Sequence, residues 1–180
     1  MINYRLLPLS EWETLAPQIF ALLSGNMLAL HPEERLSDDD FRLWLWYQTG
    51  SFAEKRFLLA EDGPRLAGYL QYSVRQAALL IEEIEIAPEY QVRFGILRGL
   101  FRELWAQLPP GVETVSAFIH RDNLRSARLA EGLGLRPAGE TASGKSLRYA
   151  GTLAAVRKAA LRLPPGGKGA SGVPRKPDAG

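Results

Sequence analysis

Apolar and polar residues follow a β-strand pattern along three successive segments of the chain. These segments are residues 56–61, 66–74 and 78–87, and the Asp62-Gly63 pair between the first two is typical of a hairpin turn. We therefore expect an antiparallel meander in the middle of the chain. Four shorter strands are predicted at residues 4–9, 113–120, 135–140 and 145–150.

Helix signals stand between these strands. Ser10 with Glu13, and Ser37 with Asp40, have the spacing of a capping box, which satisfies free N–H groups at a helix start. They predict two helices, with residues 25–36 as the loop between them. Three further helices are expected, one over residues 96–108, one between a cap at Asp122 or Asn123 and Gly132 or Gly134, and one that starts at the cap Thr152. The order β-αα-βββ-α-β-α-ββ-α is that of a mixed α/β domain.

The composition limits the class of protein. With 180 residues, 46% of them apolar, the chain suffices for one domain with a real core. Residues 164–180 are rich in Pro, Gly, Lys and Arg, which predicts a flexible basic tail behind a single domain of residues 1–163. No apolar run approaches the roughly 20 residues of a membrane-spanning helix, and the N-terminus lacks the pattern of a signal peptide. We expect no membrane partner.

Cysteine is absent, which excludes disulfides, thiolate metal sites and a cysteine nucleophile, and fits a cytoplasmic protein. The histidines and acidic residues show no metal-ligand spacing, so no metal is expected. A serine nucleophile elbow and a Walker-type phosphate loop are also missing. His31 and His120 are interpreted as structural hydrogen-bonding residues, although either could serve as a base.

The net charge of +2 hides an asymmetry between the two parts of the chain. Residues 1–62 hold ten acidic and five basic residues, whereas residues 91–162 hold five acidic and twelve basic ones. The acidic part favours a cationic partner and the basic part a phosphorylated one, with plain solvated surface as the simpler interpretation. No stacking aromatics interleave the arginines at 121, 125 and 128, so nucleic acid is not expected as a partner.

Two segments of the chain resemble the GNAT superfamily of acyl-CoA-dependent N-acyltransferases. The segment IEEIEIAPEYQVRFGILRGLFREL is similar to that family's fourth strand, pyrophosphate loop and third helix. The segment NLRSARLAEGLGLRPAGE is similar to its N-x-x-A-x-x-L-Y-E-x-x-G-F pattern, in which Asn123, Leu129, Glu131 and Gly134 match. The resemblance covers residues 2–150 and implies a mostly antiparallel central sheet flanked by helices.

Three departures from the family pattern bear on the chemistry of the site. The family's loop reads Gln/Arg-x-x-Gly-x-Gly/Ala, and Gln91 occupies its first position, but Phe94 and Ile96 stand where glycines let backbone approach phosphate. Gly95 lies between them. The third departure is Ala130, where the family often has the tyrosine that protonates the leaving thiolate. Tyr149 could replace that tyrosine only if the last strands bring it near.

The resemblance implies where a coenzyme and a base would lie. In that fold the fourth and fifth strands separate, and the backbone of residues 84–86 binds the pantetheine arm. The implied coenzyme-binding residues are Ile84, Glu85, Ile86, Gln91, Arg93, Phe94, Gly95, Ile96 and Asn123. Charged Arg93 and Arg98 could compensate for the missing glycines.

A glutamate base on the fourth strand is also implied. The candidates are Glu82, Glu83 and Glu85, of which Glu83 is favoured as the catalytic residue. Strict alternation places Glu83 and Glu85 on one face of the strand. The alternative is that these acids pair with Arg75 or other cross-strand partners.

The resulting hypothesis is an enzyme that moves an acetyl or short acyl group from acyl-CoA to a primary amine by direct attack. A small-molecule or peptide amine is the implied acceptor, and the acidic N-terminal part favours a cationic one. The alternative is a catalytically inactive GNAT-like module that senses acyl-CoA or binds a partner, as Phe94, Ile96 and Ala130 suggest. An edge strand near the C-terminus makes a homodimer possible.

Overall fold

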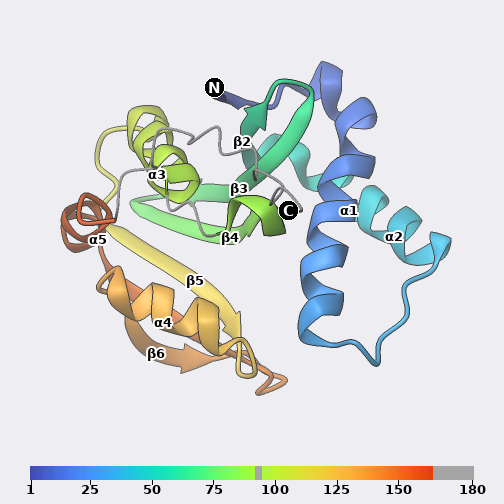
Figure 1. Cartoon of the computed structure of the whole chain (residues 1–180). Helices are drawn as coiled ribbons and strands as arrows, with labels where there is room; N and C mark the ends of the chain where they lie inside the picture. The colour runs from blue at the N-terminus through green and yellow to red at the C-terminus, as the bar shows by residue number, and fades with distance from the viewer. Residues whose placement is uncertain (92–94, 164–180) are drawn as a thin grey trace, which may run out of the picture.

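A computed structural model describes residues 1–91 and 95–163, and its elements follow the predicted order (Figure 1). The strands are β1 (Ile2–Leu6), β2 (Lys55–Asp62), β3 (Arg65–Arg75), β4 (Ala78–Ile86), β5 (Thr114–His120), β6 (Arg136–Glu140) and β7 (Ser146–Thr152). The helices are α1 (Trp12–Leu30), α2 (Asp38–Ser51), α3 (Gly95–Gln107), α4 (Leu124–Gly132) and α5 (Leu153–Ala160). The predicted tail at 164–180 lies outside the described residues.

All seven strands form one sheet in the order β1-β2-β3-β4-β5-β7-β6. Strands β2, β3 and β4 make the predicted antiparallel meander, and Gly63 in its first turn has a φ of +60°. Among the strands of the described residues only β4 and β5 run parallel, joined by the crossover through α3. The mixed, mostly antiparallel sheet expected from the sequence is therefore confirmed.

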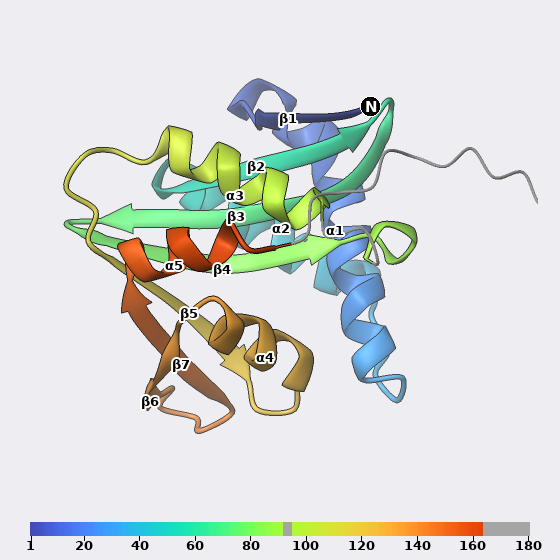
Figure 2. The same cartoon turned by 60° about the vertical axis from the view of Figure 1, so that its left-hand side comes forward.

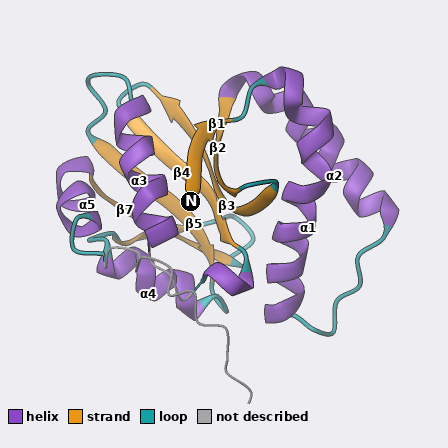
Figure 3. Ribbon diagram, turned by 45° about the horizontal axis from the view of Figure 1, so that its top comes forward, coloured by secondary structure: helices purple, strands orange, loops and turns teal. Residues whose placement is uncertain are grey.

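Helices cover both faces of the sheet, with α1 and α2 on one side and α3, α4 and α5 on the other (Figures 2 and 3). Side chains of β2 point alternately to the two faces of the sheet and contribute to the core on each. Leu58 belongs to the core beneath α3, while Phe57 and Leu59 pack with Trp12 of α1. Each face thus has its own apolar core. None of the helices in the described ranges is long and apolar enough to cross a membrane.

The start and the end of α1 differ from the prediction. Ser10 lies in a short 3-10 turn, and the helix begins at Trp12 with no side-chain cap, so the first capping box is wrong. The helix also continues to Leu30 through part of the predicted loop. Its Asn26 side chain is hydrogen-bonded to β4, and such tertiary contacts outweigh the weak helix propensity of Gly25.

The other caps are confirmed. Ser37 and Asp40 form both bonds of a capping box at α2. Asn123 caps α4 by accepting from the Ser126 N–H at 3.0 Å, and Thr152 caps α5 through the Ala155 N–H at 3.2 Å. These polar side chains set the starts of three helices.

We expect Gly99→Ala to destabilise the domain. A Cβ at residue 99 would lie 2.1 Å from the ring and hydroxyl of Tyr4, which donates to the Gly95 carbonyl at 3.1 Å. Moving the ring breaks that bond and strains the packing, which costs about 1–3 kcal/mol in the free energy of unfolding by urea.

Gly25→Ala in α1 is the matched control, since nothing lies within 4 Å of its added Cβ. It should leave stability unchanged or raise it by up to about 1 kcal/mol. Equal effects of the two substitutions would contradict the close approach of Tyr4 to α3.

Candidate active site

The parallel strands β4 and β5 separate before either of them ends. Their pairing runs from Ala78 opposite Thr114 to Ile81 opposite Ala117. Beyond that register β4 continues to Ile86 and β5 to His120 with no pairing between them. The edge of β4 that faces β5 therefore lacks a strand partner along residues 82–86.

A β-bulge lies in β4 at the point of separation. Gln71 of β3 stands opposite Glu83 and Tyr72 opposite Ile81, so Glu82 is an extra residue in β4. Bulges bend a strand and re-aim its side chains. Beyond this bulge Ile84 and Ile86 pack against the α3-side core, and Glu83 and Glu85 point to the α1–α2 face, as alternation predicted.

The carboxylates at the bulge and after it have different partners. Glu82 accepts from Lys55 Nζ and from Gln71 Nε2, both at 2.9 Å. Glu83 accepts from the Tyr69 hydroxyl at 2.7 Å. Burial raises the pKa of Glu83 although the Tyr69 hydrogen bond lowers it. The alternative partner Arg75 instead pairs with Glu54 on the surface.

Glu85 is held by a residue of α1. Asn26 Nδ2 donates to its Oε2 at 2.6 Å and to the Ile86 carbonyl at 3.2 Å. Burial raises the pKa of Glu85 to about 7, opposed by the Asn26 hydrogen bond and assisted by the nearby charge of Glu83. This carboxyl therefore changes its charge near neutral pH.

The turn after β4 is joined to α4. Gln91 donates to the Ile86 carbonyl at 3.0 Å and accepts from Arg125 Nη1 at 2.6 Å. Gly95 is the first residue of α3, and Asn123 is the cap of α4. Arg93 and Phe94 lie outside the described residues. Ile96 is buried in the core beneath α3, with 3% of its surface exposed.

The structure brings Arg125 to this turn but engages Arg98, Arg102 and Arg121 elsewhere. Arg121 pairs with Glu140, and Arg102 pairs with Glu103. Arg98 donates to the Leu163 carbonyl at 3.2 Å. These three arginines therefore make separate local contacts and do not join Arg125 at the turn.

Four other residues weighed from the sequence lie near the end of β5 or in the α3-side core. His31, just after α1, meets His120 at the end of β5, with ring centroids 5.7 Å apart and nearly perpendicular planes. Ala130 is buried in the α3-side core. Tyr149 stands opposite Ala117, the last β5 residue that pairs with β4, and is buried in the same core.

Sequence reasoning missed Asn26, Tyr69 and the contact between Gln91 and Arg125. Asn26 fell in the predicted loop, and nothing in the alternation of β3 distinguishes Tyr69 from a core residue.

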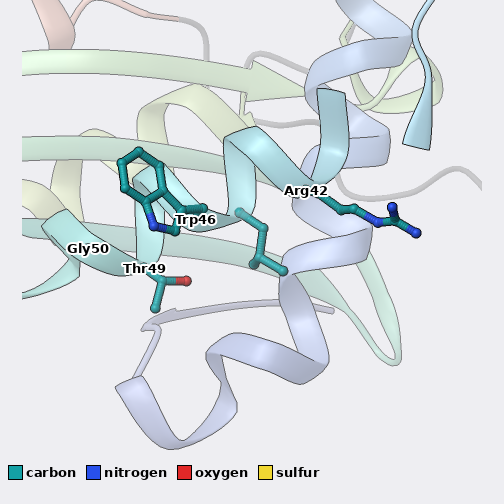
Figure 4. A pocket seen from close by; sticks show the side chains of 5 residues that line it. Arg42, Trp46, Thr49 and Gly50 are labelled. Atoms are coloured by element: carbon teal, nitrogen blue, oxygen red, sulfur yellow. The ribbon is translucent and has the colours of Figure 1, made fainter. Parts of the chain in front are cut away.

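A pocket of about 400 Å³ on α2, lined by Arg42, Leu45, Trp46, Thr49 and Gly50, contains none of the candidate residues (Figure 4). In residues 1–91 and 95–163 no group of three or more histidine and acidic side chains could hold a metal ion.

A model of the acetyltransferase (GNAT) family matches residues 16–135. The chain belongs to the GNAT acetyltransferase family. No curated protein sequence matches it significantly. The family membership agrees with the fold and with the separation of β4 from β5.

Solved GNAT structures have the same fold at low sequence identity. The PaiA N-acetyltransferase of Thermoplasma acidophilum, in complex with coenzyme A, is 15% identical with a TM-score of 0.65, over 84% of this chain and 99% of its own. An acetyltransferase of Thermus thermophilus is 18% identical with a TM-score of 0.65, over 85% of this chain and 97% of its own. The ribosomal-protein-S18-alanine N-acetyltransferase of Escherichia coli is 17% identical with a TM-score of 0.58, over 85% of this chain and 94% of its own.

We expect Glu85→Gln to stabilise the protein at alkaline pH. The folded-state pKa of Glu85, about 7, lies above the unfolded value of 4.5, so the folded state binds the proton more tightly. The free energy of unfolding therefore falls as pH rises from about 4.5 to 7, and glutamine removes this loss. Urea unfolding at pH 8 should show the variant about 1–3 kcal/mol more stable, with the difference vanishing near pH 4.5.

Glu89→Gln, at an exposed position after β4, is the control. Its stability should parallel that of the wild-type protein at both pH values. A Glu85→Gln variant that behaves in the same way would show that Glu85 is ionised normally in the folded state.

Proposed function

We propose that this chain transfers an acetyl or other short acyl group from acyl-coenzyme A to a primary amine by direct attack. The observation that carries the proposal is the separation of β4 from β5 after Ile81 and Ala117. A strand edge without a partner offers backbone N–H and C=O groups to an extended ligand such as a pantetheine arm. Family membership and the fold support the same reaction.

The coenzyme would lie along β4 and the turn that follows it. We assign the pantetheine arm to the backbone of Ile84, Glu85 and Ile86, and the phosphates to the turn from Gln91 to the start of α3. The residues proposed for this second part are Gln91, Arg93, Phe94, Gly95 and Ile96, with Asn123 from α4. Arg125 supports the assignment, because a guanidinium beside Gln91 suits a phosphate. The coenzyme A complex of the Thermoplasma relative supports this class of co-substrate.

The acceptor would approach from the α1–α2 face, where the carboxylates of β4 gather. The neutral amine nitrogen attacks the thioester carbonyl carbon, a C–N bond forms, the C–S bond breaks, and coenzyme A leaves as the thiolate. The proton lost by nitrogen passes to a carboxylate, directly or through water. Glu83 remains our candidate for this base, and Glu85 is the second, since a pKa of about 7 suits proton transfer at neutral pH.

The same carboxylates favour a cationic acceptor, such as a polyamine, an amino sugar, a lysine side chain or the N-terminus of a peptide. The Escherichia coli relative is named for an alanine of a ribosomal protein, which is consistent with a peptide amine. The second candidate function is a GNAT-like module that binds acyl-CoA without turnover. Ala130 favours it, since alanine cannot protonate the thiolate.

We expect acetyl-CoA to stabilise the folded protein. At 100 times its dissociation constant a ligand adds about 2.7 kcal/mol, which for a domain of this size raises the melting temperature by roughly 5–10 °C. Thermal melting with acetyl-CoA, with longer acyl-CoAs and without ligand measures this directly. No shift with any acyl-CoA would exclude both candidate functions, and a shift without turnover over a panel of amines would favour the sensing module.

We expect Glu83→Gln to lower kcat by about 10²–10⁴-fold while the affinity for acetyl-CoA stays nearly unchanged, because only the base is removed. Steady-state kinetics with the best amine of the panel measures this effect. Glu54→Gln, on the surface and away from β4, is the control and should retain full activity. If Glu83→Gln keeps its turnover while Glu85→Gln loses it, Glu85 is the base and our assignment of Glu83 is wrong.

A further inference from the structure

A chain of hydrogen bonds crosses the molecule where β4 and β5 separate. Arg125 of α4 donates to Gln91 Oε1 at 2.6 Å, and Gln91 Nε2 donates to Asn26 Oδ1 at 3.4 Å. Asn26 Nδ2 then donates to Glu85 Oε2 at 2.6 Å. Since α4 and α1 cover opposite faces of the sheet, the chain joins the proposed phosphate side to the carboxylate side (Figure 3).

The residues at the two ends of this series of hydrogen bonds determine which group donates and which accepts at each step. A guanidinium can only donate hydrogen bonds, and an ionised carboxylate can only accept them. Arg125 therefore requires the oxygen of the Gln91 amide, which turns the Gln91 nitrogen toward the Asn26 oxygen. The Asn26 nitrogen is thereby directed at Glu85.

Both N–H groups and the oxygen of the Asn26 amide are engaged in this arrangement. Its two N–H groups go to the Glu85 carboxylate and the Ile86 carbonyl, and its oxygen accepts from Gln91. An amide with every group engaged is held in one orientation and fixes its partners in turn. Asn26 thus links the end of α1, the end of β4 and the turn at Gln91.

We propose that Asn26 is a positioning residue that orients the Glu85 carboxylate, favours its ionised form, and is itself held in the required orientation by Gln91 and Arg125. The proposal rests on the proposed function only in taking Glu85 as part of the acceptor site. The hold of Asn26 on Glu85 is a property of the folded protein and needs no coenzyme or acceptor.

The surroundings of Glu85 show why such a donor matters. Glu83 on the same strand and Tyr69 on β3 face Glu85. The Tyr69 hydroxyl donates its hydrogen bond to Glu83, not to Glu85. Burial and the charge of Glu83 both disfavour the ionised form of Glu85, and the Asn26 hydrogen bond is the contribution that favours it. Without Asn26 the carboxyl would hold its proton to a higher pH and would be ready to accept one from an amine only above that pH.

Asn26→Leu tests this role, because leucine matches asparagine in size, adds no charge and favours helix. The probe is the titration of Glu85 in protein labelled with ¹³C at the glutamate carboxyl, identified by the signal that Glu85→Gln removes. We expect the Glu85 midpoint in Asn26→Leu to rise by about one pH unit, a tenfold change in proton affinity. Gln18→Leu, on an exposed position of the same helix, should leave the midpoint where it is.

Gln91→Met tests the hydrogen bonds that link Arg125 through Gln91 to Asn26. Methionine has the length of glutamine but cannot bind Arg125 and the Asn26 oxygen together, so the Asn26 amide is held only through its nitrogen, by Glu85 and the Ile86 carbonyl. The Glu85 midpoint should rise in this variant too, by less than in Asn26→Leu. An unchanged midpoint in Gln91→Met would overturn the part of the proposal that assigns a role to Gln91 and Arg125.

Kinetics then distinguish positioning from a purely structural role. In Asn26→Leu the pH at which kcat reaches half its maximum should move upward with the Glu85 midpoint, while KM for acetyl-CoA stays within about twofold. A change of kcat by the same factor at every pH, or an unmoved Glu85 titration in a folded Asn26→Leu protein, would overturn the proposal. Failure of the enzymatic function itself would appear separately, as the absence of any melting shift with acyl-CoA.

Discussion

The separation of β4 from β5 is the constraint on which the site depends. Two parallel strands that paired along their whole length would satisfy each other's backbone groups and leave no edge for a ligand. Here the register stops at Ile81 and Ala117, next to the bulge at Glu82. An extra residue on one strand disrupts the ladder locally and increases the twist, so the bulge is a sufficient physical reason for the strands to diverge.

The bulge also concentrates acidic side chains on the face of the sheet that α1 and α2 cover. Burying several carboxylates together is unfavourable unless each has a partner. Each of the three has one of a different kind, since Glu82 has a lysine, Glu83 a tyrosine hydroxyl and Glu85 an asparagine amide. Only the first partner carries a charge. Burial raises the pKa values of Glu83 and Glu85, and their neutral partners lower them only in part, which leaves the pKa of Glu85 at about 7, where a carboxyl exchanges protons at neutral pH.

The order of elements and the type of sheet were predictable because they depend on local periodicity. The alternation of residues 66–74 and the cap at Ser37 act over a few residues and are visible in the sequence. The length of α1 was not, because the residues after Gly25 stay helical through a contact with β4, some 60 positions away. The role of Asn26 could not be predicted from the sequence for the same reason. Its role arises only when the ends of α1 and β4 and the turn at Gln91 are brought together.

The departure from the family pattern at Ala130 weighs less when the two proton transfers of the proposed reaction are compared. A primary amine with a pKa near that of lysine must lose a proton before it attacks, which at pH 7.4 costs about 4 kcal/mol. A thiolate with a pKa of about 8.5 released unprotonated at the same pH costs only about 1.5 kcal/mol. A chain with Ala130 in place of an acid, but with partnered carboxylates on β4, lacks the smaller contribution and retains the larger one. Loss of the tyrosine alone is therefore a weaker argument against catalysis than loss of Glu83 and Glu85 would be.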